Sequence, residues 1–330
     1  MKKFYSERTV SYNSMSSLAS GYLKYSSHLE QINRWALVDP ERMILEMEEG
    51  YDEYLRIIAR NIYEHHHHAK IAMLSGPSSS GKTTTAHLLK EHLSEFGIHA
   101  EILSLDNFYR GRDLAPLRPD GTRDYESIEA LNVDRLKSCL WDLVNTGRFR
   151  VPSYNFNLGA AAEEDKEYVI QKHDMVIIEG IHALNPFITK ELPEDSLVKL
   201  YVSVKQMIKD ANGEVINPRD LRLVRRMVRD IRARGTNAGQ TLQMWASVIQ
   251  GEDLYIRPYR LTADYTINSI HMYEPCIFRA IAVPILREIP YDSPIYSKAR
   301  HLESKLMRFE SIAMDLVPPQ SMLREFIGNA

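Results

Sequence analysis

The stretch IAMLSGPSSSGKTTTAHLLK, residues 71–90, constrains the fold of this chain more than any other. A short apolar run leads into a loop rich in glycine and serine, and the loop leads into a segment with the apolar spacing of a helix. The loop fits the pattern GxxxxGK[ST], which carries meaning only between a strand and a helix. Because this context is present, the stretch predicts a loop that wraps around the phosphates of a nucleoside triphosphate.

The chemistry of such a loop follows from its residue types. Glycines let the backbone curl so that its N–H groups face the phosphates, and the positive end of the helix dipole adds to the attraction. Lys82 is expected to reach the β- and γ-phosphates, and Thr83 to offer its hydroxyl to Mg²⁺. The alternative interpretation is a capping turn rich in Ser and Gly. The loop residues expected to bind the nucleotide are Gly76, Ser78, Ser79, Ser80, Gly81, Lys82, Thr83 and Thr84.

Short apolar runs alternate with helical patterns through most of the chain. Strands are predicted at 71–75, 99–104, 174–178, 198–204 and 264–268, and helices at 81–95, 127–145, 219–234, 238–249 and 273–286. This alternation is typical of an α/β fold with a doubly wound parallel sheet that helices cover on both faces. With 330 residues, 44% of them hydrophobic, the chain can bury a sizeable core.

The alternating pattern does not fill the whole chain. Its last 40 residues are expected to be helical until Pro318 and Pro319 break the helix, with an apolar tail that docks back. The predicted divisions are a helical N-terminal extension over 1–68, a P-loop domain over 69–290 with a hairpin near 150–170 and a lid near 219–236, and a helical C-terminal extension over 291–330.

Charge and cysteine content exclude several classes of protein. Lys and Arg total 41 against 44 Asp and Glu, which argues against a nucleic-acid partner. Cys139 and Cys276 lie far apart, which fits a reducing compartment better than a disulfide framework. The N-terminus lacks the apolar core of a signal peptide, and no run approaches the roughly 20 apolar residues of a spanning helix. The sequence therefore predicts a cytoplasmic protein with no membrane partner.

Two carboxylates are expected at the same edge of the sheet as the loop. Asp106 follows the second predicted strand, and Glu179 ends the apolar run of DMVIIEG. Ligands of open α/β sheets bind at the carboxyl ends of the strands. Asp106 could accept the proton of an attacking hydroxyl or help to hold the metal, and Glu179 could orient Mg²⁺ directly or through water. The alternatives are an Asp that caps a turn and an ordinary loop acid.

The segment RLVRRMVRDIRARG, residues 222–235, is a strongly basic predicted helix. Arg222, Arg226 and Arg229 project from one face, and Arg234 lies at its end. Guanidinium groups closed over the γ-phosphate would neutralise charge and exclude water, as a lid does. The alternatives are a solvated basic face and an RNA-binding helix.

Several aromatic and histidine residues could have either a functional or a purely structural role. Tyr154 and Phe156 alternate as on a strand, so both rings share one face, where they could hold a flat substrate or simply pack within a hairpin. The histidines at 65–68 are interpreted as a solvated helix end rather than a zinc site. His182 is interpreted as a hydrogen-bonded structural residue.

Six segments together carry a resemblance to a known family. In order, they are GPSSSGKTTT, SLDNFYR, DYESIEAL, VPSYNF, DMVIIEGIHALNP and RLVRRMVRDIRARG. They resemble the uridine kinase and phosphoribulokinase family of P-loop kinases over residues 69–290. The ending VPPQSMLREFIG resembles a bacterial branch in which a uridine-kinase-like domain often follows a domain similar to the N-terminal part of threonyl-tRNA synthetase, and that leading domain is not evident here.

The resemblance implies a nucleoside-kinase-like fold that uses ATP or GTP with Mg²⁺. It matches Asp106 to the catalytic base, Tyr109 and Tyr125 to substrate-pocket aromatics, Tyr154 and Phe156 to aromatics of the nucleoside-binding hairpin, and Arg226, Arg229 and Arg234 to phosphate-contacting lid arginines. The expected catalytic residues are Asp106, Lys82 and Arg229. The expected metal ligands are Thr83, Glu179 and Asp106.

The acceptor half departs from the family pattern. Glu126 stands where the family has an Asp that holds the ribose hydroxyls. The family's PxYDFxxHSR becomes PSYNFNLGAA, so that Gly159 and Ala161 replace a His that contacts the pyrimidine and an Arg. Thr236 and Met244 replace an Arg and a Gln. A site without these hydrogen-bonding groups cannot select uracil through them, so either the acceptor differs or other residues recognise it.

The sequence thus predicts ATP-dependent phosphoryl transfer to a hydroxyl of a small molecule, first of all a nucleoside, as in uridine and cytidine kinases. A kinase of a non-nucleoside hydroxyl compound is one alternative. A nucleotide-dependent regulatory ATPase is the other. By analogy with uridine kinases, the chain is expected to form a homo-oligomer.

Overall fold

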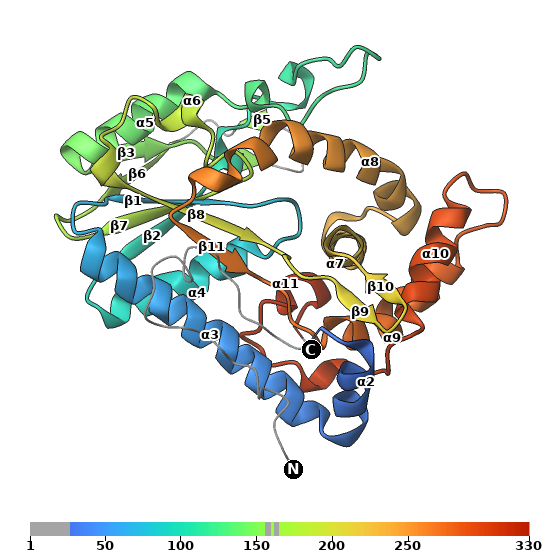
Figure 1. Cartoon of the computed structure of the whole chain (residues 1–330). Helices are drawn as coiled ribbons and strands as arrows, with labels where there is room; N and C mark the ends of the chain where they lie inside the picture. Colours follow the sequence, from blue (N-terminus) through green and yellow to red (C-terminus); the bar gives the residue numbers. More distant parts are fainter. Residues whose placement is uncertain (1–26, 156–159, 162–164, 330) are drawn as a thin grey trace.

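A computed structural model describes residues 27–155, 160–161 and 165–329. Its centre is a five-stranded parallel sheet in the order β11-β8-β1-β7-β2 (Figure 1). The strands are β1 (Ile71–Ser75), β2 (Ala100–Ser104), β7 (Met175–Glu179), β8 (Leu197–Ser203) and β11 (Tyr265–Asn268). The parallel sheet predicted from the alternating pattern is confirmed, and β1, which carries the loop motif, is its middle strand.

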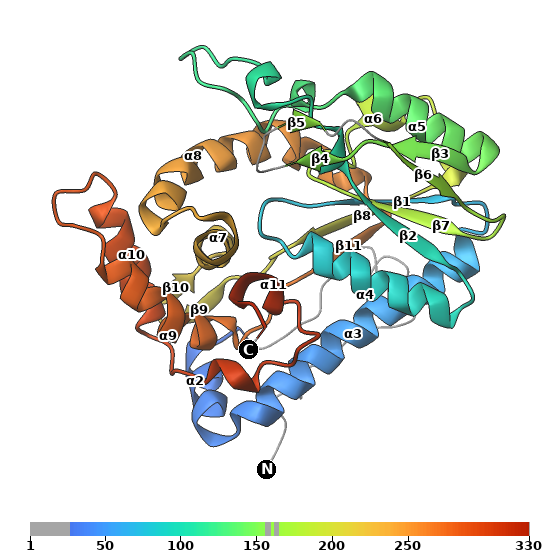
Figure 2. The ribbon, with the colours of Figure 1, turned by 180° about the vertical axis from the view of Figure 1, so that it is seen from behind.

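Apolar side chains cover both faces of the sheet. Every residue of β1 and β7 is buried, which explains why these strands read as continuous apolar runs rather than as alternating patterns. One core forms between the sheet and the helices α3 (Pro40–His65) and α4 (Lys82–Glu95). The other forms against α5 (Val133–Thr146) and α6 (Pro186–Thr189), on the opposite face (Figure 2). The predicted doubly wound arrangement is therefore confirmed.

The long helix α3 forms for clear local reasons. Asp39 accepts a hydrogen bond from the Arg42 amide, and Pro40 occupies the first helical position, where its missing N–H costs nothing. Met43, Ile44 and Met47 begin an apolar stripe that packs against the core. The predicted helical character of the N-terminal extension therefore holds for α3 and for α2 (Leu29–Val38), while residues 1–26 lie outside the described part.

Three predicted helices differ from the structure. The helix expected at 127–145 begins only at Val133, because Asn132 caps it by accepting from the Arg135 amide. The helix expected at 238–249 continues, as α8 (Ala238–Tyr255). In the C-terminal extension, α10 (Tyr296–Leu306) ends well before the prolines, and the remaining regular elements there are a short 3-10 turn and α11 (Arg324–Ile327).

The remaining elements surround the carboxyl edge of the sheet or lie beside it. The helix α7 (Pro218–Arg234) lies beyond the loop that leaves β1, and α8 continues from it (Figure 1). The other elements are the antiparallel pairs β3 (Arg148–Val151) with β6 (Lys166–Val169), β4 (Tyr154–Asn155) with β5 (Ala160–Ala161) and β9 (Ile208–Asp210) with β10 (Gly213–Ile216), and helix α9 (Glu274–Arg287).

The apolar tail docks back, as the sequence predicts. Met322, Leu323, Phe326 and Ile327 are buried in the core that contains α3 and α4. None of the helices formed by the described residues is both long enough and apolar enough to cross a membrane.

Candidate functional site

The loop between β1 and α4, hereafter the P-loop (Gly76–Thr84), has the curled backbone that phosphate binding requires. A Cβ on Gly76 would lie 2.1 Å from the Val202 carbonyl oxygen, so only glycine fits there. Ser79 has φ +58° and Gly81 has φ +85°, both in the left-handed region. A non-glycine residue seldom adopts this conformation, and such strain is typical of functional loops. Alternating left- and right-handed residues turn successive N–H groups toward one point, where an anion binds.

Polar atoms without partners line the same loop. The hydroxyls of Ser79 and Ser80 are buried and have no hydrogen-bond partner among the described residues. The helix α4 begins at Lys82, so its first N–H groups lack helical acceptors. Buried polar groups normally find partners, and a bound phosphate would supply them. The P-loop therefore fits the polyphosphate that the sequence predicts.

Lys82 lies at the start of α4 and reaches back over the loop. Its Nζ donates to the Pro77 carbonyl at 3.3 Å. Burial lowers the pKa of Lys82, and the negative charges of Glu179, Glu325 and Asp106 oppose that shift. The ammonium group is thus close to both sequence-predicted carboxylates and to a third that the sequence analysis did not include.

Asp106 and Glu179 meet at the carboxyl edge of the sheet, as expected. Glu179 pairs in register with Leu74 on one side and Ser104 on the other, and Asp106 follows Ser104 by two residues. Burial raises the pKa of both carboxyls, and the charge of Lys82 counteracts the shift in each. Phosphate chemistry would therefore take place between these two acids and the P-loop.

The same residues fit Mg²⁺. Nowhere in the described residues do three or more His, Cys, Asp or Glu side chains form a ready-made metal site. Mg²⁺ prefers oxygen ligands, keeps several waters and binds through one or two carboxylates plus phosphate oxygens. Thr83, whose side chain is exposed, together with Asp106 and Glu179, is a donor set of that kind.

The basic helix α7 lies directly on the P-loop. Arg222 donates to the Ser78 carbonyl at 3.2 Å, and Arg226 donates to the Ser78 hydroxyl at 2.8 Å. Arg225, which the sequence analysis did not single out, donates to the Ser79 carbonyl at 3.3 Å. Of the arginines predicted to contact phosphate, Arg226 is therefore anchored directly on the loop that would hold it.

One buried acid organises the predicted phosphate-contacting arginines. Asp230 is 2% exposed and lies 3.2 Å from Arg226, 3.0 Å from Arg229 and 3.6 Å from Arg234. A carboxylate shared by three guanidinium groups orients them without neutralising them all. The sequence analysis missed Asp230, although a single acid inside a run of arginines on one helix could have indicated it.

Arg225 belongs to a second buried ion pair. It donates to Glu274 through both Nε and Nη2, and neither side chain is exposed. Glu274 begins α9, so this pair ties α7 to the helix that follows β11. Removing one partner of a buried pair typically costs about 3–5 kcal/mol of folding free energy. No sequence pattern links these two positions, which lie 49 residues apart.

Aromatic rings line the acceptor side of the site. The rings of Tyr109 and Tyr154 lie 5.9 Å apart at 58°, and the Tyr109 hydroxyl donates to the Tyr125 carbonyl at 3.4 Å. Burial, followed by the charge of Asp106, raises the pKa of Tyr109 well above its usual value. Tyr125 is 48% exposed, and Phe156 lies outside the described residues. Two of the predicted aromatics are thus together beside Asp106.

Glu126 faces the phosphate side of the site from the loop before α5. Burial raises its pKa, and the charges of Arg226 and Lys82 are the main opposing effects. A Cβ on Gly251 would lie 2.5 Å from the Glu126 Cβ, so a glycine in α8 makes room for this acid. Its neighbour Asp124 is instead paired with Arg118 at 2.8 Å. Glu126 is therefore the acid available to a substrate.

His182 differs from its sequence interpretation. It is buried beside Tyr255, with ring centroids 6.1 Å apart, but neither ring nitrogen has a hydrogen-bond partner among the described residues. Burial lowers its pKa to about 4, so the imidazole is neutral near pH 7. The backbone groups of Glu126 and Ser127 lie near the ring, and interaction with them opposes the shift of this pKa. A neutral ring beside Glu126 is a candidate for recognising the acceptor.

The positions that depart from the family pattern are only partly visible. Met244 is 44% exposed, and the Thr236 hydroxyl donates to the Arg234 carbonyl at 3.5 Å. Ala161 lies in β5, and Gly159 falls outside the described residues. No charged side chain takes the place of the missing Arg at position 236 itself.

The model of the Phosphoribulokinase / Uridine kinase family matches residues 71–274. The chain belongs to this family. The match covers the sheet, the P-loop, both predicted acids and the basic helix α7. The family consists of P-loop kinases that act on hydroxyl groups of small molecules, and such kinases use ATP and Mg²⁺ in general. The chain is accordingly a phosphotransferase of the kind that has an alcohol group as acceptor.

Individual relatives are distant. A uridine kinase of Mycoplasma genitalium is 28% identical over 195 residues, which cover 59% of this chain and 82% of that protein. A uridine kinase of Staphylococcus aureus is also 28% identical over 195 residues, with 59% and 84% covered. Among solved structures, phosphoribulokinase from Rhodobacter spheroides matches with a TM-score of 0.41 and 17% identity, over 61% of this chain and 68% of that one.

Proposed function

We propose that this chain transfers the γ-phosphoryl group of ATP to a hydroxyl of a nucleoside. The observation that carries the proposal is the meeting of Asp106, Lys82 and Glu126 between the P-loop and the aromatic pair Tyr109 and Tyr154. A base, a phosphate-binding cation and a hydroxyl-binding acid beside flat apolar surface are the groups that such a reaction needs.

The donor is bound by backbone and charge. In the proposed complex, P-loop N–H groups and Lys82 hold the phosphates, and Arg226, Arg229 and Arg234 neutralise charge on the transferred group. Thr83 with Asp106 or Glu179 would hold Mg²⁺, which would supply further neutralisation of phosphate charge. Because phosphoryl transfer depends mainly on positioning and electrostatics, these groups need little further chemistry of their own.

Asp106 is the proposed base. Its carboxylate takes the proton of the acceptor hydroxyl while that oxygen bonds to the γ-phosphorus and the bond to the leaving ADP breaks. The raised pKa of Asp106, caused by burial, makes it a better proton acceptor than an exposed Asp, and the charge of Lys82 favours its ionised form. The buried position also keeps competing water away from the reacting groups.

The acceptor is proposed to lie with its ribose on Glu126 and its base against the tilted rings of Tyr109 and Tyr154, with Tyr125 at the edge of the pocket. The neutral imidazole of His182, next to Glu126, is proposed to contribute one hydrogen bond to an edge of the base. This contact would compensate for the recognition groups that the family pattern has and this chain lacks.

A second candidate is a kinase of a non-nucleoside hydroxyl compound. It is favoured by one observation: Thr236 and Met244 leave the acceptor side without the charged and amide groups that the family pattern places there. A regulatory ATPase would show slow ADP release that no acceptor stimulates.

The test is acceptor-dependent ADP release from the full chain with MgATP. The acceptor panel contains uridine, cytidine, adenosine, ribose, fructose and glycerate. Stimulation by a pyrimidine nucleoside, with a phosphorylated product seen by mass spectrometry, supports the proposal. Stimulation by a sugar or glycerate alone replaces it with the second candidate, and no stimulation by any compound favours the regulatory ATPase.

A further inference from the structure

The C-terminal segment 321–328 reaches the P-loop, far from it in sequence. The Glu325 carboxylate accepts from the Thr84 hydroxyl at 3.1 Å and from the Thr84 backbone N–H at 3.5 Å. Met322 lies over Gly81, because a Cβ there would come within 2.7 Å of its sulfur atom. Figure 2 shows α11, which contains Glu325, between α4 and α7. The tail thus covers the first turn of the helix that follows the loop.

The position of this carboxylate is informative. Thr84 is the third residue of α4, so its N–H belongs to the helix start, which has no helical acceptors and attracts anions. In P-loops, backbone N–H groups at this point cradle the α- and β-phosphates. Glu325 therefore holds an anion position that a nucleotide would need, and its charge is also felt at Lys82.

Several contacts keep the segment in place. Arg232 of α7 donates to the carbonyls of Glu325 at 3.3 Å and Phe326 at 3.5 Å. The Phe326 ring lies 5.1 Å from the guanidinium of Arg225. Ser321 donates to Glu48 of α3 at 2.6 Å. The tail is therefore bound to α7 and to α3 at the same time as it covers α4.

We propose that Glu325 competes with a donor phosphate for Thr84, so that segment 321–328 sets the nucleotide affinity of the P-loop. Nucleotide binding displaces the carboxylate from Thr84 and loosens the segment, while the contacts of Ser321 hold its base on α3. The inference rests on the proposed function only in that the P-loop binds a nucleotide.

The test compares MgADP binding by calorimetry to the full chain and to Glu325→Gln. Loss of the competing charge should lower Kd by roughly three- to tenfold, the size expected for one charge-assisted contact that is partly exposed. The matched control is Glu310→Gln, which removes an acid of the same C-terminal extension that pairs with Arg279 at 3.7 Å. It should leave Kd unchanged. An equal or higher Kd in Glu325→Gln would overturn the proposal.

A second measurement needs no variant. MgADP should increase amide hydrogen exchange in residues 321–328 of the wild-type chain, and slower exchange there would overturn the competition. Both measurements omit the acceptor. Tight MgADP binding in Glu325→Gln without any acceptor-stimulated ADP release would therefore remove the proposed kinase function and leave this contact intact.

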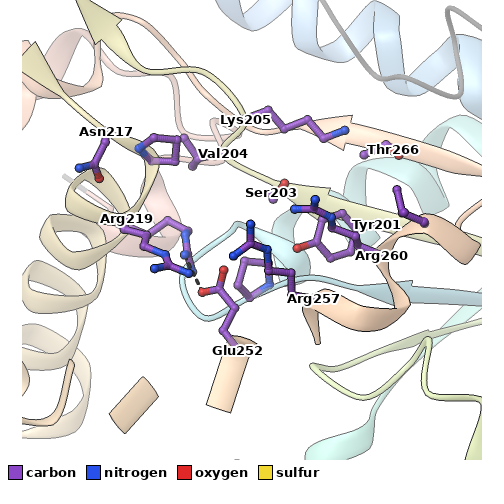
Figure 3. Close-up of a pocket in the computed structure, with 14 residues that line it drawn as sticks. Tyr201, Ser203, Val204, Lys205, Asn217, Arg219, Glu252, Arg257, Arg260 and Thr266 are labelled. Carbon is purple, nitrogen blue, oxygen red and sulfur yellow. Dashed lines mark hydrogen bonds and ion pairs between the residues drawn. The ribbon is translucent and has the colours of Figure 1, made fainter. Parts of the chain in front are cut away.

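An independent observation concerns a cavity of about 650 Å³ on the other side of α7. The start of α7 forms one border of the cavity (Figure 3). The other borders are the strands β8 and β11, the end of α8 and the 3-10 segment 257–262. Pro77 is its contact with the P-loop, and neither Lys82 nor Asp106 lines it. The cavity is thus distinct from the site described above.

Positive charge dominates the lining of this cavity. Its cationic side chains are Lys205, Arg219, Arg222, Arg257 and Arg260. Glu252 pairs with Arg222 at 2.6 Å, and Asp253 pairs with Arg219 at 2.6 Å and Arg257 at 3.3 Å. These two carboxylates therefore pair with Arg222, Arg219 and Arg257, and neither of them pairs with Arg260.

Arg260 is the lining cation whose charge is not offset by a carboxylate of the described residues. Among the described residues Arg260 makes no ion pair and donates no hydrogen bond. Burial, followed by the charge of Arg260, lowers the pKa of Lys205 to about 8, so the charge of Arg260 acts on this second lining cation. Like charges held together in a partly enclosed cavity favour a bound anion. The volume matches that of small-molecule sites.

We infer that this cavity binds a phosphorylated small molecule, with its phosphate on Arg260 and its organic part against Tyr201 and Leu261. The planar fork of arginine matches the oxygen atoms of a phosphate, which can accept two of its N–H groups at once. Arg222 lines the cavity and also donates to the Ser78 carbonyl. The side chain of Arg222 would therefore lie between the bound ligand and the P-loop.

The test uses ribose 5-phosphate, with ribose as the uncharged control, and measures binding by calorimetry in a Lys82→Ala background that weakens phosphate binding at the P-loop. Arg260→Ala added to this background should raise Kd by about tenfold or more. The matched control Arg148→Ala, an exposed arginine that pairs with Glu167, should not change Kd. Equal binding with and without Arg260, equal binding of ribose, or no saturable binding in the Lys82→Ala background would each overturn the inference.

Discussion

The donor side and the acceptor side of the site are built in different ways. On the donor side the P-loop is held by Arg222, Arg225 and Arg226 of one helix, and Asp230 fixes the arginines around it. On the acceptor side the pocket is assembled from rings and acids of separate loops, and His182 has no hydrogen-bond partner among the described residues. The donor side is thus a connected network of ion pairs and hydrogen bonds, whereas the acceptor side consists of separate groups.

This difference teaches where specificity can change. Phosphate is recognised through backbone N–H groups and a helix start, which almost any sequence of the right local pattern can form. The acceptor is recognised through a few side chains that can be exchanged one at a time without disturbing the loop. The family pattern is accordingly intact in the P-loop and altered at Glu126, Thr236 and Met244.

Asp106 lies where the two sides meet, so its variant should show the largest effect. Asp106→Asn keeps the shape but cannot accept a proton, and we expect kcat to fall by about 10³-fold, within the usual range for loss of a general base. Initial rates of ADP release with the best acceptor measure this. The Kd of ADP measured without Mg²⁺ and the melting temperature should remain close to wild type. Near-normal turnover would contradict the assignment of the base.

Asp230→Asn should impair phosphoryl transfer on the donor side and leave acceptor binding unchanged. The three arginines lose their shared anchor, so kcat should fall by about 10²-fold, the size of one lost preorganised charge contact in a transition state. Acceptor binding, measured by calorimetry without nucleotide, should be unchanged. Glu303→Gln is the matched control, because Glu303 also pairs with two arginines but lies in α10. If both variants lose the same activity, bracing by Asp230 is not specific to the site.

Glu126→Gln should affect the acceptor side alone. Replacing the charged acceptor of hydroxyl protons by an amide should raise the acceptor KM by about tenfold, equivalent to one weakened charge-assisted hydrogen bond. The KM for ATP should change little, because Glu126 does not touch the P-loop in the proposed complex. The control is Glu129→Gln, three residues further along the same loop. An effect confined to the ATP KM would place Glu126 on the donor side.

The sequence predicts the parts of this site that local patterns determine. Strand β1, the P-loop and the start of α4 follow from one continuous stretch, and the acids Asp106 and Glu179 follow from their places after buried strands. These predictions succeed because strand, loop and helix signals are short-range. The order of the strands also fits the rule that ligands bind at the carboxyl edge of the sheet.

Long-range pairings are the part that could not be predicted. Arg225 and Glu274, or Thr84 and Glu325, lie 49 and 241 residues apart, and periodicity does not say which charges will meet. The early ending of α10 has a related cause. Phe309 and Ile312 are buried after the helix ends, so tertiary packing overrides the helical tendency of the segment.

The smallest predicted effect is a change of stability with pH that depends on the neutral His182 of the acceptor side. His182 has a pKa of about 4 in the folded chain, below the roughly 6.5 of an unfolded histidine. As the pH falls, the unfolded chain therefore takes up a proton at His182 at a higher pH than the folded chain does. Stability is therefore lost as the pH falls below the unfolded value. Between about pH 7 and pH 6 the free energy of unfolding should drop by about 0.7 kcal/mol from this residue.

His182→Gln cannot take up that proton and should lack this component of the drop, whereas the exposed His173→Gln should retain it. Urea unfolding of the three proteins at both pH values measures the difference. A drop in His182→Gln equal to that of the wild type would mean that the imidazole takes up its proton at the same pH in the folded chain as in the unfolded chain. The ring would then be protonated as easily as one in water, and recognition of a base edge by a buried neutral His182 would have to be abandoned.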